Sequence, residues 1–253
     1  MSRIEVIPEK GRYCTKSLRY LLGMDWVDTV SRMDDAINNG GSDYYTPGLS
    51  EKIESDRARF DEMRFDGYDD EIIIRGEENP LKARYEDGVD AIYVGEDLVV
   101  ETALEEGWNT EIPENWSGIP STADSLLSAY GFDREERLGP DISWSPMEYG
   151  TISRAPETVL VPEEWRNLGG LVARDRFGGD IEIRTIPEGE DEETRIAESG
   201  ATGVYMYESG GTAESAGLDY VEPVPERWRS RLGVFEAEDS DQVFWPRRYD
   251  GFR

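Results

Sequence analysis

The fold is predicted from one stretch that occurs twice in the chain. It reads Val161-Pro162-Glu163-Glu164-Trp165-Arg166-Asn167-Leu168-Gly169 and returns, one residue longer, as Val224-Pro225-Glu226-Arg227-Trp228-Arg229-Ser230-Arg231-Leu232-Gly233. Proline at a first helical position, glutamate at the positive end of a helix and glycine after its last turn are helix start and stop signals. Each copy is therefore predicted to form a strand, one or two helical turns and a second strand, with Trp165 or Trp228 as the apolar anchor.

The spacing of the two copies is 224 − 161 = 63 residues, and a shorter echo stands at 112–116. A single repeated pair is too little for a solenoid, which needs at least about three units. The sequence leaves open whether the pair marks an internal duplication within one domain or a coincidence.

Apolar periodicity predicts helices first and strands later. Leucine, tryptophan and other apolar residues recur every three or four positions over 18–37 and again over 49–63, which is typical of helices. Short β-like runs at 72–74, 81–85, 89–94 and 98–103 are separated by turn residues and predict an antiparallel meander. Glycine, proline, asparagine and tryptophan at 107–120 indicate a connection.

The second half is predicted to be rich in strands. A short helix should follow a cap at Ser121 or Thr122, and prolines should keep 133–156 irregular. Strands are expected over 171–174 and 180–186, paired across a glycine turn, and over 203–207. The fold class is therefore α+β, with a helical segment plus meander at 1–106, a connection at 107–120 and a β-rich domain at 121–253.

The charge of the chain is strongly negative, with 27 Lys+Arg against 56 Asp+Glu and a net charge of −29. Such a surface repels phosphate, so nucleic acid is not an expected partner except at the basic ends. Seven tryptophans, thirteen tyrosines and seven phenylalanines supply core material and argue against a disordered chain.

The choice of cation gives an environmental clue. Only four of the 27 cations are lysines, so 27 − 4 = 23 are arginines, and no lysine follows Lys82. Carboxylates hold water and cations strongly, and self-repulsion is screened in molar KCl, where the Debye length is about 3 Å. This composition resembles proteins of salt-accumulating haloarchaea and of their tailed viruses. An acidic protein of ordinary salinity is the alternative.

Cys14 is the only cysteine, so it forms no disulfide within the chain and is expected to be buried in the first helix. The first residues lack an apolar signal core, and no run approaches the roughly 18 apolar residues of a membrane span. We therefore expect a protein made in the cytoplasm of a halophilic host, with no membrane partner.

The chain has no histidine, which excludes Ser-His-Asp and Cys-His machinery and histidine-containing metal sites. Nucleotide-binding glycine motifs and the nucleophile elbow are also missing. Asp/Gly turns at 66–71 and 175–182 present oxygens, but neither matches a calcium loop, and ordinary hairpin turns are favoured over metal. No cofactor, metal or catalytic residue is predicted, and the protein is not expected to be an enzyme.

Both ends of the chain are basic, and the last ten residues combine arginines with aromatic side chains, which commonly anchor protein interfaces. Their partner is expected to be an acidic subunit, although a final strand folded onto its own domain fits the same residues. The predicted partner-binding residues are Phe244, Trp245, Arg247, Arg248, Tyr249, Phe252, Arg253, Arg3, Lys10 and Arg12.

These features together predict a non-enzymatic structural subunit of a halophilic assembly, in the first instance a capsid, neck or tail component of a haloarchaeal tailed virus. One alternative is a carboxylate-dependent hydrolase that acts on carbohydrate through a Trp- and Tyr-lined cleft. The other is a cellular protein–protein adaptor, which shares the interface chemistry.

Overall fold

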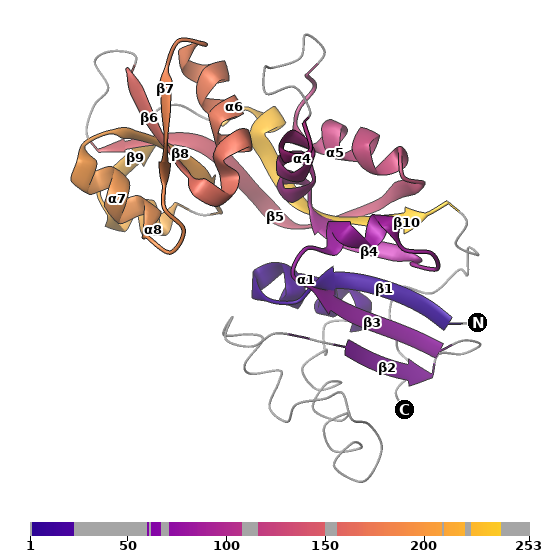
Figure 1. Cartoon of the computed structure of the whole chain (residues 1–253). Helices are drawn as coiled ribbons and strands as arrows, with labels where there is room; N and C mark the ends of the chain where they lie inside the picture. Colours follow the sequence, from indigo (N-terminus) through magenta and orange to yellow (C-terminus); the bar gives the residue numbers. More distant parts are fainter. Residues whose placement is uncertain are drawn as a thin grey trace. The chain divides into compact units, whose positions relative to one another are not determined.

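The structure is a computed structural model, and it divides the chain into two compact units (Figure 1). Unit 1 comprises 1–95, 124–139 and 232–253, and unit 2 comprises 96–123 and 140–231. Both units are therefore assembled from segments that are separate in the sequence, whereas the predicted domains were consecutive ranges. The described residues are 2–22, 60, 62–66, 71–107, 116–149, 156–208, 210–220 and 224–238.

Unit 1 is built on a mixed sheet with three parallel strands at its centre. β1 (Ser2–Pro8) lies between β3 (Glu71–Glu77) and β4 (Ala91–Gly95), and both pair with it in parallel. β2 (Glu62–Asp66) pairs antiparallel with β3, and β10 (Arg229–Ala237) pairs antiparallel with β4 through its residues from Leu232 onward. The strand order in this unit is β2-β3-β1-β4-β10.

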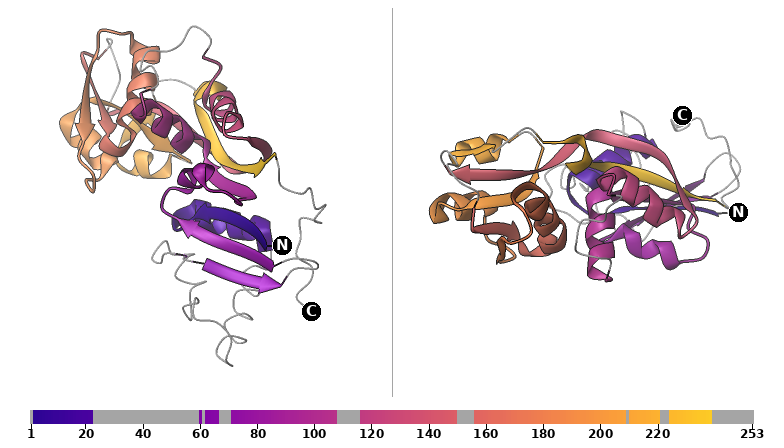
Figure 2. Two further views of the ribbon diagram at one scale, coloured as in Figure 1. Left: turned by 45° about the vertical axis from the view of Figure 1, so that its right-hand side comes forward. Right: turned by 90° about the horizontal axis from the view of Figure 1, so that it is seen from above.

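α1 (Gly11–Leu22) covers one face of this sheet, as Figure 2 shows. Its Cys14 and Leu18 are fully buried against Ile7 of β1 and Val234 of β10. The prediction that Cys14 is buried in the first helix is thus confirmed. The 3-10 helix η1 (Pro80–Tyr85) begins where the Asn79 side chain accepts a hydrogen bond from the backbone N–H of residue 81.

Unit 2 is built on a second group of strands, in which β6 (Thr158–Pro162) is central. β7 (Glu182–Ile186) and β8 (Thr202–Tyr207) pair with it in parallel on either side. β5 (Phe132–Tyr149) pairs antiparallel with β8, and the short β9 (Leu218–Tyr220) pairs with β5. The order here is β7-β6-β8-β5.

Helices cover both faces of the unit 2 sheet. Buried side chains of α4 (Glu96–Glu105) and α6 (Arg166–Phe177) share one cluster with β6 and β8, and those of α7 (Glu192–Ser199) and α8 (Gly211–Ser215) share the other with β5 and β8. α7 lies so close to β8 that a Cβ on Gly203 would stand 2.0 Å from a carbon of Ile196. The turns η2 (Glu163–Trp165) and η3 (Glu226–Trp228) add tryptophans to the first cluster.

The two units share one plan. In each unit, a central parallel strand is followed by a helix that covers the sheet, and the next two parallel strands lie on either side of that central strand. These elements are β1, α1, β3 and β4 in unit 1, and β6, α6, β7 and β8 in unit 2. In each, the strand beyond is antiparallel and comes from a segment that also contributes to the other unit: β10 and β5. The chain thus contains an internal structural repeat of open α/β sheets.

The coarse prediction of helices with a sheet is confirmed, but the predicted antiparallel meander is wrong. Its run at 81–85 is the 3-10 helix η1, its run at 98–103 lies in α4, and its remaining runs give β3 and β4, which flank β1 in parallel. Short apolar runs fit a buried strand and a buried helix equally well, and only the partners decide.

Three details of the C-terminal half also differ from the prediction. Residues 171–174 lie in α6, so the expected hairpin with 180–186 does not form, and 133–149 form most of the long strand β5. The repeated stretch adopts two structures: the first copy leads through η2 into a helix, and the second leads through η3 into β10. The short helix predicted after residue 121 is present as α5 (Ile119–Ser128), and the strand predicted at 203–207 is β8.

No helix among the described residues is long and apolar enough to span a membrane.

Candidate functional site: the carboxyl edge of the unit 2 sheet

Open sheets of parallel strands bind ligands at the carboxyl ends of the strands, where the chain connections diverge to opposite sides. In unit 2 this point lies where β6 ends, because β6 connects to β7 on one side and β8 lies on the other. The segments that follow the three parallel strands therefore meet at one edge. They are η2 with the start of α6, the loop before α7, and the residues after Tyr207.

The turn after β6 places an indole and a carboxylate at this edge. Trp165 is half-buried, and its ring packs edge-on against the buried Trp144 with 5.3 Å between ring centroids. The Trp165 Nε1 donates a hydrogen bond of 3.0 Å to Oε1 of the exposed Glu164. Packing on Trp144 holds the Trp165 ring in place, and the hydrogen bond holds the Glu164 carboxylate beside it. The turn therefore presents a flat aromatic surface next to a negative charge.

A second carboxylate comes from the neighbouring strand. Glu192 opens α7, which follows β7, and it is half-buried. Burial, followed by repulsion from Glu193, Glu164 and Asp191, raises the pKa of Glu192 to about 7. Glu164 and Glu192 follow the adjacent parallel strands β6 and β7, so both carboxylates lie at the same edge of the sheet. A cation bound here would reverse this shift, since an opposite charge favours the ionised carboxylate.

The start of α6 is occupied by a carboxylate from another helix. Glu101 of α4 accepts hydrogen bonds from the backbone N–H of Asn167 (3.1 Å), from Asn167 Nδ2 (2.8 Å) and from the backbone N–H of Leu168 (2.6 Å). Glu101 is 2% exposed. Burial raises its pKa, although the three hydrogen bonds favour the ionised form. The first N–H groups of a helix, which commonly bind anions, are here satisfied within the chain.

A second buried carboxylate lies one turn earlier on α4. Asp97 Oδ1 accepts hydrogen bonds of 3.0 Å from the Ser230 hydroxyl and 3.1 Å from the backbone N–H of Leu98, while the Asp97 backbone N–H donates to the same hydroxyl. Burial raises the pKa of Asp97 to about 6, against these hydrogen bonds and the nearby indole of Trp144. Asp97 and Glu101 are four residues apart and so share one face of the helix.

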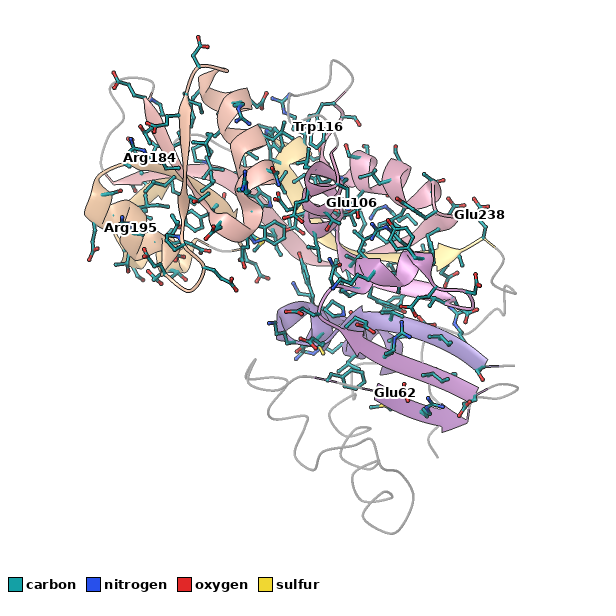
Figure 3. All side chains as sticks on the ribbon, viewed as in Figure 1. Glu62, Glu106, Trp116, Arg184, Arg195 and Glu238 are labelled. Carbon is teal, nitrogen blue, oxygen red and sulfur yellow. The ribbon has the colours of Figure 1, made fainter. Side chains whose placement is uncertain are left out.

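Two stacked tryptophans belong to the hydrophobic cluster that packs against α4 and α6. Trp228 is fully buried, and Trp116, labelled in Figure 3, stacks on it with 5.4 Å between ring centroids. The Trp228 Nε1 donates to Asp175 Oδ2 at 2.9 Å, and Arg227 forms an ion pair with the same carboxylate. The carboxylate of Asp175 therefore serves as an internal hydrogen-bond acceptor. Across the described residues, no group of three or more acidic or cysteine side chains could hold a metal ion.

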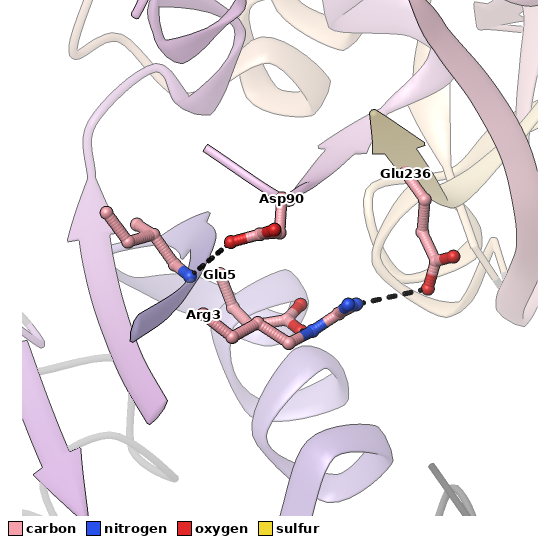
Figure 4. A network of polar contacts seen from close by, with 5 residues as sticks. Arg3, Glu5, Asp90 and Glu236 are labelled. Atoms are coloured by element: carbon pink, nitrogen blue, oxygen red, sulfur yellow. Dashed lines mark hydrogen bonds and ion pairs between the residues drawn. The ribbon is translucent and has the colours of Figure 1, made fainter. Parts of the chain in front are cut away.

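Unit 1 contains a separate polar network on the α1 face of its sheet, drawn in Figure 4. Arg3 Nε pairs with Glu5 Oε1 at 2.5 Å, and Arg3 Nη2 pairs with Glu236 Oε1 at 3.2 Å. The Ile4 backbone N–H donates to Asp90 Oδ2 at 2.7 Å. Glu5 is 2% exposed, and burial raises its pKa despite Arg3.

This network joins β1, β10 and the residue before β4, and it includes the first half of β1, away from the carboxyl ends of the parallel strands. We therefore assign it to stability, because it ties three strands together at the edge opposite to the one where ligands bind in open sheets.

The predicted partner-binding residues are distributed as follows. Arg3 lies in β1 and is held by two internal carboxylates, with 13% of its side chain exposed. Lys10 is exposed between β1 and α1, and Arg12 lies in the first turn of α1. Phe244, Trp245, Arg247, Arg248, Tyr249, Phe252 and Arg253 lie outside the described residues. A role for any of them in partner binding stays a prediction.

No protein-family model matches the chain, and no curated protein matches it. Solved structures match along most of its length, at low identity. One is the ATP phosphoribosyl transferase (HisG:HisZ) complex from Thermotoga maritima, with a TM-score of 0.49, 13% identity, and coverage of 94% of this chain and 88% of that one. Another is YhfZ from Shigella flexneri, with a TM-score of 0.43, 11% identity, and coverage of 95% and 80%.

A third is the amino acid ABC transporter substrate-binding protein AbpA from Streptococcus pneumoniae, bound to L-arginine, with a TM-score of 0.38, 9% identity, and coverage of 94% and 82%. The prediction of a structural subunit of a virion is contradicted by these matches, which include a transferase complex, a substrate-binding protein and the regulatory domain of OxyR2 from Vibrio vulnificus. The hydrolase and adaptor alternatives stay predictions.

Sequence reasoning missed every residue of the carboxyl edge except Trp165, which it took for a structural anchor. Glu101, Glu164 and Glu192 are three among 56 acidic residues, and nothing local distinguishes them. The one usable signal was the position of Glu164 and Trp165 between a β-branched run and a helix start, where the ligand edge of an open sheet begins.

Proposed function

We propose that the protein is a binding protein for a small cationic molecule, held without chemical change at the carboxyl edge of unit 2. The observation that carries the proposal is the convergence of Glu164, Trp165 and Glu192 at the ends of two adjacent parallel strands. Carboxylates attract an ammonium or guanidinium group, and the face of an indole stabilises a cation by about 0.5–2 kcal/mol.

The electrostatics of the edge favour a cation over an anion. Glu192 has its pKa raised to about 7 partly by Glu164, which means that negative charges there lack full compensation. Arg195 lies near, but it pairs with Glu190 at 3.7 Å. The start of α6, which would otherwise receive an anion, already holds Glu101. A cation is therefore the ligand that both charges and hydrogen bonds accommodate.

The test is calorimetric titration of the full chain with putrescine and choline, and with L-glutamate and glucose as anionic and neutral probes. We expect saturable binding of at least one cation and none of glutamate or glucose. Replacing Glu164 and Glu192 by glutamine should raise the Kd about tenfold, equivalent to about 1.4 kcal/mol. The matched control is Glu198→Gln, an exposed carboxylate at the far end of α7.

The absence of saturable binding of either cation contradicts the proposal, and so do two further results. One is an affinity for glutamate equal to that for the cations. The other is an equal loss of cation affinity in the Glu198→Gln control and in the Glu164/Glu192 variant.

A further inference from the structure

We propose that Glu101 is a specificity-determining residue: it permanently fills the oxyanion position at the start of α6 and thereby excludes carboxylate- and phosphate-bearing ligands from the carboxyl edge. The inference rests on the proposed function for the identity of the preferred ligand, but its structural part stands on the contacts of Glu101 alone.

The geometry is that of a bound carboxylate. Oε1 receives two donors from Asn167 and Oε2 receives the Leu168 N–H, at distances between 2.6 and 3.1 Å. α6 is a helix of 12 residues that begins one turn after β6 ends, so its N-terminus points its N–H groups at the ligand edge. These are the groups with which helices that follow a parallel strand bind anions.

The side chain that fills this position is buried. Glu101 is 2% exposed, and its neighbours on α4, Val100 and Leu104, are buried in the same cluster as Leu168 of α6. An external oxyanion would have to displace a carboxylate that is already desolvated and hydrogen-bonded three times. Such an exchange gains no hydrogen bond and leaves the Glu101 charge buried without a partner.

The charges that face Glu101 come from its own helix and from the start of α6. Glu105, exposed and one turn later on α4, repels it, and Asp97, one turn earlier, is itself buried. Arg166, the first residue of α6, is exposed. The N–H groups of α6 and the Asn167 amide are thus the direct partners that the structure gives to the Glu101 carboxylate.

The experiment removes the internal carboxylate and offers an external one. Thermal unfolding is measured for the full chain, for Glu101→Ala and for Glu105→Ala, while formate replaces chloride at constant ionic strength. We expect Glu101→Ala to have a lower Tm than the wild type and to regain stability with added formate in a saturable way, with an affinity for formate at least about tenfold above that of the wild type. The wild type and Glu105→Ala should show the same small response to formate, which measures the general salt effect.

Equal responses of all three proteins to formate overturn the proposal. If Glu101→Ala folds only when formate is present, the proposal is supported. If it folds in neither salt, Glu101→Gln decides. This variant keeps the volume but turns an amide nitrogen toward N–H donors, so it should be less stable than the wild type and should not respond to formate. Wild-type stability of Glu101→Gln overturns the proposal.

A separate arm isolates the proposed function. Wild type and Glu101→Ala are titrated with putrescine and choline, which carry no carboxylate, and with L-glutamate. Rescue by formate without binding of either cation refutes the cation-binding function and leaves the role of Glu101 intact. Binding of a cation without rescue by formate supports the cation-binding function and refutes the role of Glu101.

Discussion

The substitution Asp97→Asn should remove a loss of stability with rising pH that the burial of the Asp97 carboxyl causes. The carboxyl of Asp97 is 1% exposed, and its pKa rises from the ordinary value of 3.8 to about 6 on folding. The folded state therefore holds this proton more tightly than the unfolded state, and the contribution of Asp97 to stability falls as the pH rises from about 4 to about 6.

The size of this effect follows from the two pKa values. A difference of about two pH units, at about 1.4 kcal/mol for each, corresponds to about 3 kcal/mol. The asparagine variant carries no titrating group at this position and keeps an oxygen that accepts from Ser230. Its stability relative to the wild type should therefore increase by about 3 kcal/mol between pH 4 and pH 7 and stay constant above.

The assay is urea unfolding of both proteins at a series of pH values in one KCl concentration. Any constant offset between them reflects the amide itself, whose NH2 group lacks a partner, and only the change with pH is tested. Glu106→Gln, at the exposed residue that follows the same helix (Figure 3), is the control and should show no comparable change. A pH-independent difference between Asp97→Asn and the wild type would refute the reasoning.

Three further predictions concern other parts of the molecule. Cation affinity, measured by calorimetry, should fall as the pH drops below about 7, because the Glu192 carboxyl then becomes neutral, and Glu192→Gln should flatten this profile. Gly203→Ala should lower the free energy of unfolding by about 1–3 kcal/mol by overpacking, whereas Gly179→Ala, which meets no atom within 4 Å, should not. Arg3→Ala should cost about 3–5 kcal/mol because it leaves the buried Glu5 carboxylate without its ion-pair partner, and the added substitution Glu5→Gln should recover part of this loss in a double-mutant cycle.

The sequence predicted those elements whose signals are local. The buried Cys14 in a first helix, a short helix near residue 121 and the strand at 203–207 follow from periodicity. The predicted cap at Ser121 or Thr122 is wrong, because α5 begins at Ile119 and both residues lie inside it. The helix at 166–177 was missed at its centre because an apolar run of Leu171 to Ala173 fits a strand as well as a helix.

Neither the parallel pairing of the strands nor the structural repeat of the two units could be predicted from the sequence. β1 pairs with residues of β3 about seventy positions away, and no local pattern encodes such a partner. The repeated stretch that was visible in the sequence does not mark the structural repeat. Its first copy lies at the end of the central strand β6, and its second precedes β10, which is the strand that pairs antiparallel with β4.

The functional prediction failed because composition identifies an environment and not a site. The chain has 56 acidic residues, and many of them are solvated. Nothing in the sequence distinguishes the few carboxylates that lie at the ends of strands from the others. The acidic composition still predicts a halophilic protein, and a comparison of stability in molar KCl and in dilute buffer would test that prediction.

The most direct test of the account is hydrogen exchange of the full chain with and without a cation that binds in the titrations. The account predicts protection of the amides around Glu164 to Leu168 and around Glu192, at the ends of β6 and β7. Residues 182–184, at the beginning of β7, should exchange unchanged. Protection confined to the beginning of β7 or to unit 1, with none around Glu164, would contradict the claim that the carboxyl edge of unit 2 is the binding site.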